Sequence, residues 1–329
     1  MSERPSLKQV LASIEKDCEV AVRKLSDIPI IDILAVSSGS YLLNDALGVG
    51  GYPRGRIIEI FGAPSGGKSS ISLMAVAEAQ KAGGIAAFID VEHCFSKAYA
   101  TSLGVDVDNL YFVQPDFGEQ ALEILERLTS TNEFDIIVLD STAALVPKAE
   151  AEAEMVKESM ALQARMMSKA LRKLTPIIGK TKTVVIFINQ TRQNVAVMYG
   201  NPLSTPGGEA LKFYSSVRLN VRKIGGSDIK EGDVVKGHHI NITCVKNKVG
   251  PPSRSAELTF RFEGGIDKTL DLIEYALNKG ALDLKGHTYS FGDQKWVGRD
   301  NAIEAIKSDL VLQASITQWV KDKQSEGNK

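Results

Sequence analysis

Short apolar runs alternate with helical stretches through the middle of the chain. The runs are rich in Ile and Val and occupy residues 56–61, 85–90, 135–140 and 184–189. Helical stretches begin at Lys68, lie around residues 118–130, and precede the run at 184. Continuous apolar runs separated by helices are typical of strands that are buried on both faces of a parallel sheet. The pattern therefore predicts a doubly wound α/β core with right-handed crossovers.

Both ends of the chain differ from this middle. Residues 5 to about 25 carry an apolar stripe at helical spacing, which packs either on the protein's own core or on a neighbouring subunit. The stripe consists of Leu7, Val10, Leu11, Ile14 and Cys18. After about residue 235 come alternating runs at 238–248 and 256–262, then helical stretches at 268–279 and near 301–322. We expect an N-terminal helical segment (1–34), a core (35–265) and a small α+β C-terminal domain (266–329).

Composition excludes several classes of protein. With 43% hydrophobic and 24% charged residues, the chain is neither disordered nor collagen-like. No apolar run approaches the length of a membrane span, and the N-terminus lacks a secretory apolar core. The three cysteines, Cys18, Cys94 and Cys244, are widely spaced and odd in number, which indicates a reducing cytoplasm. The net charge of −1 means that any affinity for nucleic acid depends on local charge.

A phosphate-binding loop follows the first central run. Residues 62–69 fit the pattern G-x-x-x-x-G-K-[ST] between a predicted strand and a predicted helix. Glycines let backbone N–H groups approach phosphate oxygens, and the helix N-terminus adds partial positive charge. Lys68 would reach the β- and γ-phosphates, and Ser69 would bind Mg²⁺. The expected nucleotide-binding residues are Gly62, Ala63, Pro64, Ser65, Gly66, Gly67, Lys68, Ser69 and the adjoining Ser70.

Polar residues end three of the other runs, and in such a sheet they lie near the phosphate loop. Asp140 either caps the next helix or holds Mg²⁺, and the phosphate loop favours Mg²⁺. Glu92 and Asp90 both follow the run 85–90 and compete for the role of orienting the attacking water. Gln190 either senses the γ-phosphate or is an ordinary strand-end residue. These positions predict binding and hydrolysis of ATP with Mg²⁺.

Charge is segregated along the chain. Residues 150–158 are acidic, whereas residues 159–208 contain basic side chains and no carboxylate. The basic residues are Arg165, Lys169, Arg172, Lys173, Lys180, Lys182 and Arg192. Four of them share one helical face, which is either a solvated surface or a site for a nucleic-acid backbone, and the nearby phosphate site favours the second. The Gly/Pro-rich stretch 191–208 is then either a loop that orders on DNA or a passive surface loop.

A series of short motifs runs through the chain. They are GS (39–40), ALG (46–48), GAPSGGKS (62–69), FIDVEH (88–93), QPD (114–116), GEQALEI (118–124), DS (140–141), PKAE (147–150), ARMMS (164–168), FINQ (187–190), GNP (200–202), ALKFY (210–214) and VKNK (245–248). In this order and spacing they resemble the RecA family of homologous-recombination ATPases. The resemblance extends from about residue 36 to 265 and continues more loosely into both ends.

The resemblance implies a cytoplasmic, DNA-dependent ATPase that forms filaments on single-stranded DNA and pairs that strand with homologous duplex DNA. It implies that Glu92, and not Asp90, activates water, and that Gln190 links the γ-phosphate to a DNA-binding loop. Tyr99 would stack on adenine, with Phe262 near the nucleotide. Further implied partners are additional copies of the chain, LexA-like repressors, and single-strand-binding or loader proteins.

Other residues take subunit and DNA roles by the same resemblance. Lys246 and Lys248 would reach the neighbour's ATP, Phe213 would relay nucleotide state between subunits, and the N-terminal helix would pack on the adjacent protomer. Residues 153–160 resemble the first DNA-binding loop, and residues 192–208 resemble the second. The implied DNA contacts are Met160, Arg165, Arg172, Arg192, Val195, Gly207, Gly208 and Arg218.

Several positions depart from the family pattern. Ser96 stands where an acidic residue usually contacts adenine, and Phe262 stands in place of a tyrosine. Asn194 and Ala196 replace a basic residue and a glycine in the second loop, and Glu209 replaces a neutral residue. The C-terminus has no acidic tail, which implies readier loading on duplex DNA.

Two other functions use the same core. A ring-forming helicase usually needs a further domain, for which this chain has little room. A regulatory filament or co-protease scaffold would use ATP only to switch assembly.

Overall fold

The computed structural model describes residues 5–27, 33–152, 160–193 and 203–327. It divides into two compact units, Met1–Ile33 and Leu34–Lys329. The first unit contains helix α1 (Leu7–Cys18) and a 3-10 helix η1 (Leu25–Asp27). The predicted apolar stripe lies wholly within α1, none of whose residues is buried. The helix ends at Cys18 and not near residue 25, because the backbone of Glu19 turns into the left-handed region with a φ of 55°.

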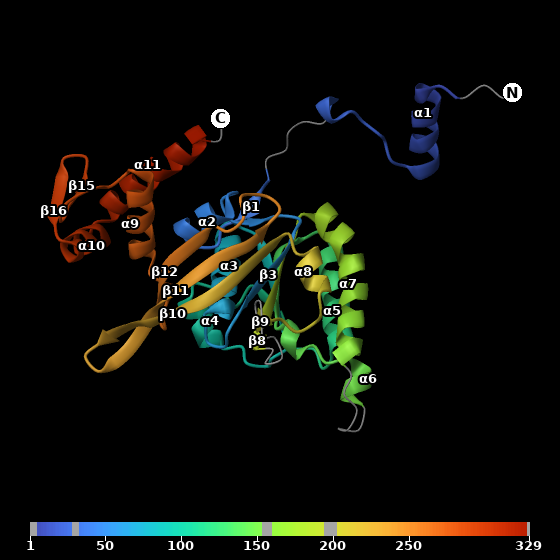
Figure 1. Cartoon of the computed structure of the whole chain (residues 1–329), viewed down its shortest axis with the longest axis horizontal. Helices are drawn as coiled ribbons and strands as arrows, with labels where there is room; N and C mark the ends of the chain where they lie inside the picture. Colours follow the sequence, from blue (N-terminus) through green and yellow to red (C-terminus); the bar gives the residue numbers. More distant parts are fainter. Residues whose placement is uncertain (1–4, 28–32, 153–159, 194–202, 328–329) are drawn as a thin grey trace. The chain divides into compact units, whose positions relative to one another are not determined.

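A nine-stranded, mostly parallel sheet forms the centre of the second unit (Figure 1). In spatial order its strands are β13 (Gly265–Ile266), β12 (Ser255–Arg261), β11 (Val234–Asn247), β10 (Val217–Glu231), β3 (Ile57–Gly62), β7 (Val184–Gln190), β6 (Phe134–Asp140), β4 (Ile85–Asp90) and β5 (Leu110–Val113). The strands from β10 to β5 run parallel to their neighbours, while β11, β12 and β13 continue the sheet in antiparallel fashion. The four central apolar runs are β3, β4, β6 and β7, which confirms the predicted parallel core.

The remaining elements of this unit cover or flank the sheet. The helices are α2 (Tyr41–Leu47), α3 (Lys68–Lys81), α4 (Lys97–Ser102), α5 (Gly118–Ser130), η2 (Thr142–Ala144), α6 (Lys148–Ala151), α7 (Met160–Thr181) and α8 (Ala210–Tyr214), and the short strands are β1 (Ala35–Val36), β2 (Tyr52–Pro53), β8 (Arg192–Gln193) and β9 (Leu203–Ser204). Ile58 and Ile60 pack with α2 and α3, whereas Ile57 packs with α5, α7 and α8. Both faces of the central strands are therefore dry, which explains their unbroken apolar sequences.

The last sixty residues build a smaller cluster of mixed structure. Its elements are α9 (Lys268–Lys279), β14 (Asp283–Lys285), β15 (Thr288–Phe291), β16 (Gln294–Val297), α10 (Arg299–Ser308) and α11 (Leu310–Gly327). The three strands form an antiparallel sheet, and the helices share a hydrophobic cluster that contains Ile273, Ile306 and Ile316. The single helix expected near 301–322 is wrong. Asp309 is extended, and its Oδ1 accepts hydrogen bonds from the N–H groups of Val311 and Leu312, so a second helix begins there.

Asp271 of α9 joins this C-terminal segment to the core. Its carboxylate accepts hydrogen bonds from Ser40 Oγ at 2.8 Å and from the backbone N–H groups of Tyr41 at 2.6 Å and Leu42 at 3.3 Å. Ser40 is the N-cap of α2, so the carboxylate lies at the start of that helix, where a negative charge is favourable. Burial raises the pKa of Asp271 to about 6. Among the described residues, no helix is both long and apolar enough to cross a membrane.

Candidate nucleotide and DNA site

The phosphate loop connects β3 to α3 and takes a conformation that its glycines permit. Gly67, the N-cap of α3, has a φ of 88° in the left-handed region. A Cβ atom on Gly62 would lie 2.2 Å from the carbonyl oxygen of Val221 on the neighbouring strand, so only glycine fits there. The loop thus ends at a helix N-terminus whose free N–H groups suit an anion.

Lys68 and Ser69 extend from the first turn of α3 toward the end of β6. Lys68 Nζ donates a hydrogen bond to the carbonyl oxygen of Ala63 at 2.7 Å and is nearly buried. Ser69 Oγ donates to Asp140 Oδ2 at 2.6 Å. Burial lowers the pKa of Lys68, while the charges of Asp140 and Glu92 oppose that shift. A hydroxyl and a carboxylate in contact are hard oxygen donors of the kind that Mg²⁺ prefers, so these residues fit that ion.

Asp140 is almost buried at the carboxyl end of β6. Burial raises its pKa to about 6, and the nearby charges of Glu92 and Asp90 act in the same direction. The hydrogen bond from Ser69 and the charge of Lys68 lower it. The site therefore holds more carboxylates than cations, and a bound cation would relieve this repulsion.

Glu92 and Asp90 have different surroundings although they are two residues apart. Glu92 Oε1 accepts hydrogen bonds from Ser141 Oγ and, at 2.8 Å, from Gln190 Nε2. Asp90 Oδ2 accepts from the backbone N–H of Phe95 at 3.1 Å and from Gln114 Nε2 at 3.0 Å. The carboxylate of Asp90 is occupied in holding the chain after β4, whereas Glu92 lies beside the predicted phosphate sensor.

An aromatic cavity of about 350 Å³ continues from the phosphate loop. Its lining residues are Ser65, Gly66, Gly67, Lys68, Ser69, Ser70, Tyr99, His238, Phe260 and Phe262. Tyr99 Oη and Ser70 Oγ are hydrogen-bonded at 2.6 Å. Ser96, which departs from the family pattern, is the N-cap of α4, and its Oγ accepts from the N–H of Tyr99 at 3.3 Å. The cavity brings the predicted phosphate residues 65–70 together with the predicted adenine residues Tyr99 and Phe262, while Gly62, Ala63 and Pro64 do not line it. It adds His238 and Phe260, which the sequence analysis missed.

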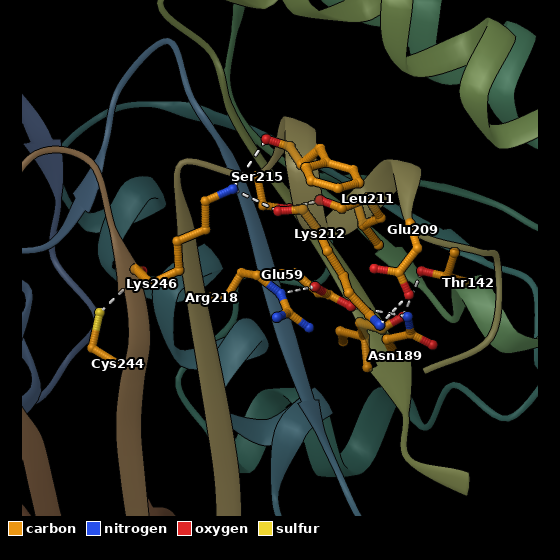
Figure 2. Close-up of polar contacts among 12 residues, drawn as sticks. Glu59, Thr142, Asn189, Glu209, Leu211, Lys212, Ser215, Arg218, Cys244 and Lys246 are labelled. Atoms are coloured by element: carbon orange, nitrogen blue, oxygen red, sulfur yellow. Dashed lines mark hydrogen bonds and ion pairs between the residues drawn. The ribbon is translucent and has the colours of Figure 1, made fainter. Parts of the chain in front are cut away.

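A second polar cluster joins β3, β7 and β10 (Figure 2). Glu59 is fully buried, and its carboxylate accepts hydrogen bonds from Asn189 Nδ2 at 3.0 Å and from Arg218 Nε at 2.5 Å. Asn189 Nδ2 also donates to the carbonyl oxygen of Pro206 at 3.2 Å, and its Oδ1 accepts from the N–H of Gln190. Arg218, an expected DNA contact, is thus held in an ion pair with its side chain 15% exposed. Glu59 has no motif around it that distinguishes it in the sequence.

The residues expected at a subunit interface lie together near α8. Lys246 Nζ donates to the carbonyl oxygens of Lys212 at 2.5 Å and Phe213 at 3.0 Å. Figure 2 shows the Lys246 side chain extending toward Lys212. Burial lowers the pKa of Lys246, and the charges of Lys248 and Arg218 add to this effect. The Phe213 side chain is 70% exposed, and Lys248 is exposed. Glu209, another departure, accepts from Lys212 Nζ at 2.5 Å.

The predicted basic face lies on α7 but is not uniformly basic. Arg165, Lys169, Arg172 and Lys173 are all exposed. A groove of about 660 Å³ between α5 and α7 is lined by three of them together with carboxylates of α5. The charged residues of this groove are Glu119, Glu123, Glu126, Arg127, Arg165, Lys169 and Lys173. Of the four basic residues on α7, Arg172 alone does not line this groove of mixed charge.

The predicted DNA loops are described only in part. Residues 153–159 lie outside the described residues, as do Asn194, Val195 and Ala196. Met160 begins α7, and Arg192 lies in β8. At the end of the second loop, Gly207 is buried near Thr142 and Met167, and Gly208 has a φ of 75°. A Cβ atom on Gly208 would lie 2.9 Å from that of Ala164, so this end of the loop packs closely on α7.

Comparisons with known proteins show what this chain is similar to. The family model described as RecA N-terminal domain matches residues 5–267. The chain is 49% identical to protein RecA of Thermus aquaticus over 308 residues, which cover 93% of this chain and 90% of that protein. It is 50% identical to protein RecA of Bacteroides thetaiotaomicron over 309 residues, which cover 93% of each.

A solved structure shows the same fold at lower sequence identity. The crystal structure of the RadB recombinase matches with a TM-score of 0.54 and 18% identity, covering 70% of this chain and 98% of that one.

Proposed function

Because the chain belongs to the RecA family, we propose that Lys68, Ser69 and Asp140 bind ATP with Mg²⁺ and that Glu92 activates the attacking water. As a member of that family, the protein is a DNA-dependent ATPase that acts in homologous recombination and DNA repair by strand exchange. One observation carries the assignment of residues. Four separate chain segments bring the side chains of Lys68, Asp140, Glu92 and Gln190 to one edge of the sheet.

The phosphates would lie on the loop between β3 and α3. On binding, the Lys68 ammonium exchanges the carbonyl oxygen of Ala63 for phosphate oxygens, which are stronger acceptors. Ser69 and Asp140 would hold Mg²⁺, which when bound neutralises charge that develops on the phosphates. Of the proposed nucleotide-binding residues 62–70, residues 65–70 line the adjoining cavity, and Tyr99 and Phe262 would offer ring faces for the base.

Glu92 would take the proton of the attacking water. Ser141 and Gln190 both donate to its Oε1, whereas Oε2 accepts only a long, weak contact from Cys94 Sγ at 3.8 Å among the described residues, so Oε2 is the oxygen that would accept the proton. The Gln190 amide donates to Glu92 and would also donate to an incoming γ-phosphate, so its position would depend on the bound nucleotide. The adjacent Asn189 contacts Pro206, so this change would reach the end of the second DNA loop.

Assembly and DNA binding complete the proposal. Lys246 and Lys248 would contact ATP of the adjacent subunit, with Phe213 in the interface and the exposed stripe of α1 packed on that subunit. Single-stranded and duplex DNA would bind along the two loops and Arg172, with phosphate contacts supplying most of the affinity. The further DNA contacts proposed are Met160, Arg165, Arg192, Val195, Gly207, Gly208 and Arg218. The proposal also includes a cytoplasmic location. It further includes contacts with LexA-like repressors and with loader or single-strand-binding proteins.

Negative-stain electron microscopy tests this function most directly. The full chain is mixed with single-stranded DNA and a slowly hydrolysed ATP analogue, and the control omits the nucleotide. We expect continuous helical filaments that depend on the nucleotide. Closed rings would contradict the proposal and support the helicase alternative, and filaments that are identical without nucleotide would contradict the role of the phosphate loop in assembly.

A further inference from the structure

His238 lies in an unusual environment on β11, beside the phosphate loop. It pairs with Phe260 of β12 in the sheet, and the Phe260 ring lies 3.4 Å from the position of a Cβ atom on Gly67. The His238 side chain is 4% exposed. Both ring nitrogens, Nδ1 and Nε2, are buried and have no hydrogen-bond partner among the described residues.

A buried imidazole without partners is unfavourable, because its N–H group and its lone pair both lose their contacts with water. Burial lowers the pKa of His238, and the charge of Lys223 acts in the same direction while Asp228 opposes it. The ring is therefore neutral at pH 7 and offers one donor and one acceptor. The neighbouring His239 is different, since its Nδ1 lies 3.2 Å from Thr259 Oγ1.

The surroundings of His238 are aromatic and open into the cavity of the nucleotide site. Its ring centroid lies 5.6 Å from those of Phe260 and Phe262, and the Phe262 side chain is 45% exposed. Rings of this kind suit a flat heteroaromatic base. Other polar groups near this wall are already engaged, because Tyr99 Oη pairs with Ser70 and Ser96 Oγ caps α4.

We propose that His238 forms a hydrogen bond with the adenine base of the bound nucleotide and so contributes to recognition of the base. This inference rests on the proposed ATP site and adds a polar side-chain contact to the base. Ser96 has no carboxylate for that purpose, whereas His238 has an unsatisfied donor and acceptor in the wall of the same cavity.

The test compares ligand binding by the full-length protein through calorimetric titration with Mg²⁺ and without DNA. The ligands are ATP and ribose 5-triphosphate, which keeps the sugar and phosphates but lacks the base. The variant His238→Phe keeps an aromatic ring, and His238→Gln keeps a donor and an acceptor. His239→Phe is the matched control, because it makes the same change one residue along the strand, on the opposite face. Circular dichroism checks that each variant is folded.

We expect His238→Phe to weaken ATP binding by about 3- to 10-fold, the range for loss of one hydrogen bond between neutral groups. Ribose 5-triphosphate should bind this variant and the original protein equally, His238→Gln should recover part of the ATP affinity, and His239→Phe should not change it. Unchanged ATP binding by His238→Phe overturns the proposal. An equal loss with ribose 5-triphosphate also overturns it, because the contact would then not be to the base.

Failure of the proposed ATP site gives a different result. If the unmodified protein bound neither ATP nor ribose 5-triphosphate, the assignment of the phosphate loop would be wrong, and the inference about His238 would fall with it. If it bound both ligands with equal affinity, the phosphate site would stand and the role of His238 would be rejected.

Discussion

The two polar clusters of the central sheet differ in how completely their charges are paired. Around the phosphate loop, Lys68 interacts with the carboxylates of Glu92 and Asp140, Asp90 adds a further negative charge near Asp140, and burial raises the pKa of Asp140 to about 6. In the second cluster, which joins β3, β7 and β10, the buried carboxylate of Glu59 accepts hydrogen bonds from Arg218 and Asn189. The first cluster has more carboxylates than cations, and a bound Mg²⁺ would balance this excess of negative charge. The second is satisfied within the protein, which is typical of a structural element.

The strongest test of the first cluster is the removal of its cation. Lys68→Ala should weaken ATP binding by about 100-fold or more and abolish nucleotide-dependent filaments, because a charged contact to phosphate is lost. Calorimetric titration and electron microscopy measure the two effects. Lys81→Ala is the control, since Lys81 ends the same helix and forms an ion pair with Glu78 on the surface. Normal filaments from Lys68→Ala would contradict the assignment of the phosphate loop.

Glu92 provides a test of the chemistry apart from binding. Glu92→Gln should lower the rate of DNA-dependent ATP hydrolysis by about 10²- to 10⁴-fold, because the amide cannot accept the proton of water. ATP and DNA binding should persist, and phosphate release measures the rate. Glu133→Gln, an exposed position between α5 and β6 that does not line the α5–α7 groove, serves as the control. Full turnover by Glu92→Gln would transfer the role to Asp90.

The second cluster predicts a loss of stability when its pairing is broken. Arg218→Met should destabilise the protein by about 3–5 kcal/mol, because Glu59 would remain charged and buried without its partner. The double variant Glu59→Gln/Arg218→Met should recover much of that loss, as measured by the midpoint of thermal unfolding. Equal midpoints for the single variant and the original protein would show that Glu59 is not compensated by Arg218. DNA affinity of the double variant separately tests the predicted DNA contact of Arg218.

Asp271 gives the smallest expected effect and depends on pH. Its folded-state pKa of about 6 lies above the usual value for an unfolded chain, so the protonated form is favoured by folding. This contribution is complete below about pH 4 and is lost as the pH rises through 6. Asp271→Asn cannot ionise, so its unfolding free energy relative to the original protein should rise by up to about 3 kcal/mol between pH 4 and 7. A stability difference that does not vary with pH would show that the carboxyl group does not titrate in this range.

Local signals predicted which strand ends the structure brings together around the phosphate loop. The four central strands end at Gly62, Asp90, Asp140 and Gln190, and a parallel sheet brings such ends together whatever its detailed packing. Strand β10 was not predicted, although it lies next to β3. Its first half alternates buried Val217, Leu219 and Val221 with polar residues, and its second half is largely exposed, so it lacks the apolar run of a central strand.

Sequence periodicity did not predict two features outside the sheet, the mixed charge of the α7 face and the break between the last two helices. The basic residues of α7 predict a positive face, but the carboxylates that share its groove come from α5, about forty residues earlier. The break at Asp309 likewise depends on a side chain that caps its own backbone. In both cases the outcome depends on a carboxylate, on α5 or at Asp309, whose contacts the spacing of apolar residues does not reveal.

The sequence by itself determined the parallel core, the phosphate loop and the polar residues that end the central strands. These features depend on apolar runs and on local backbone freedom. Only the tertiary structure decided which charges are paired. Glu59 is 159 residues from Arg218 and 130 from Asn189, and His238 reaches the nucleotide cavity from an outer strand. Electrostatic and hydrogen-bonding partners are selected by distance in space, and the fold alone sets that distance.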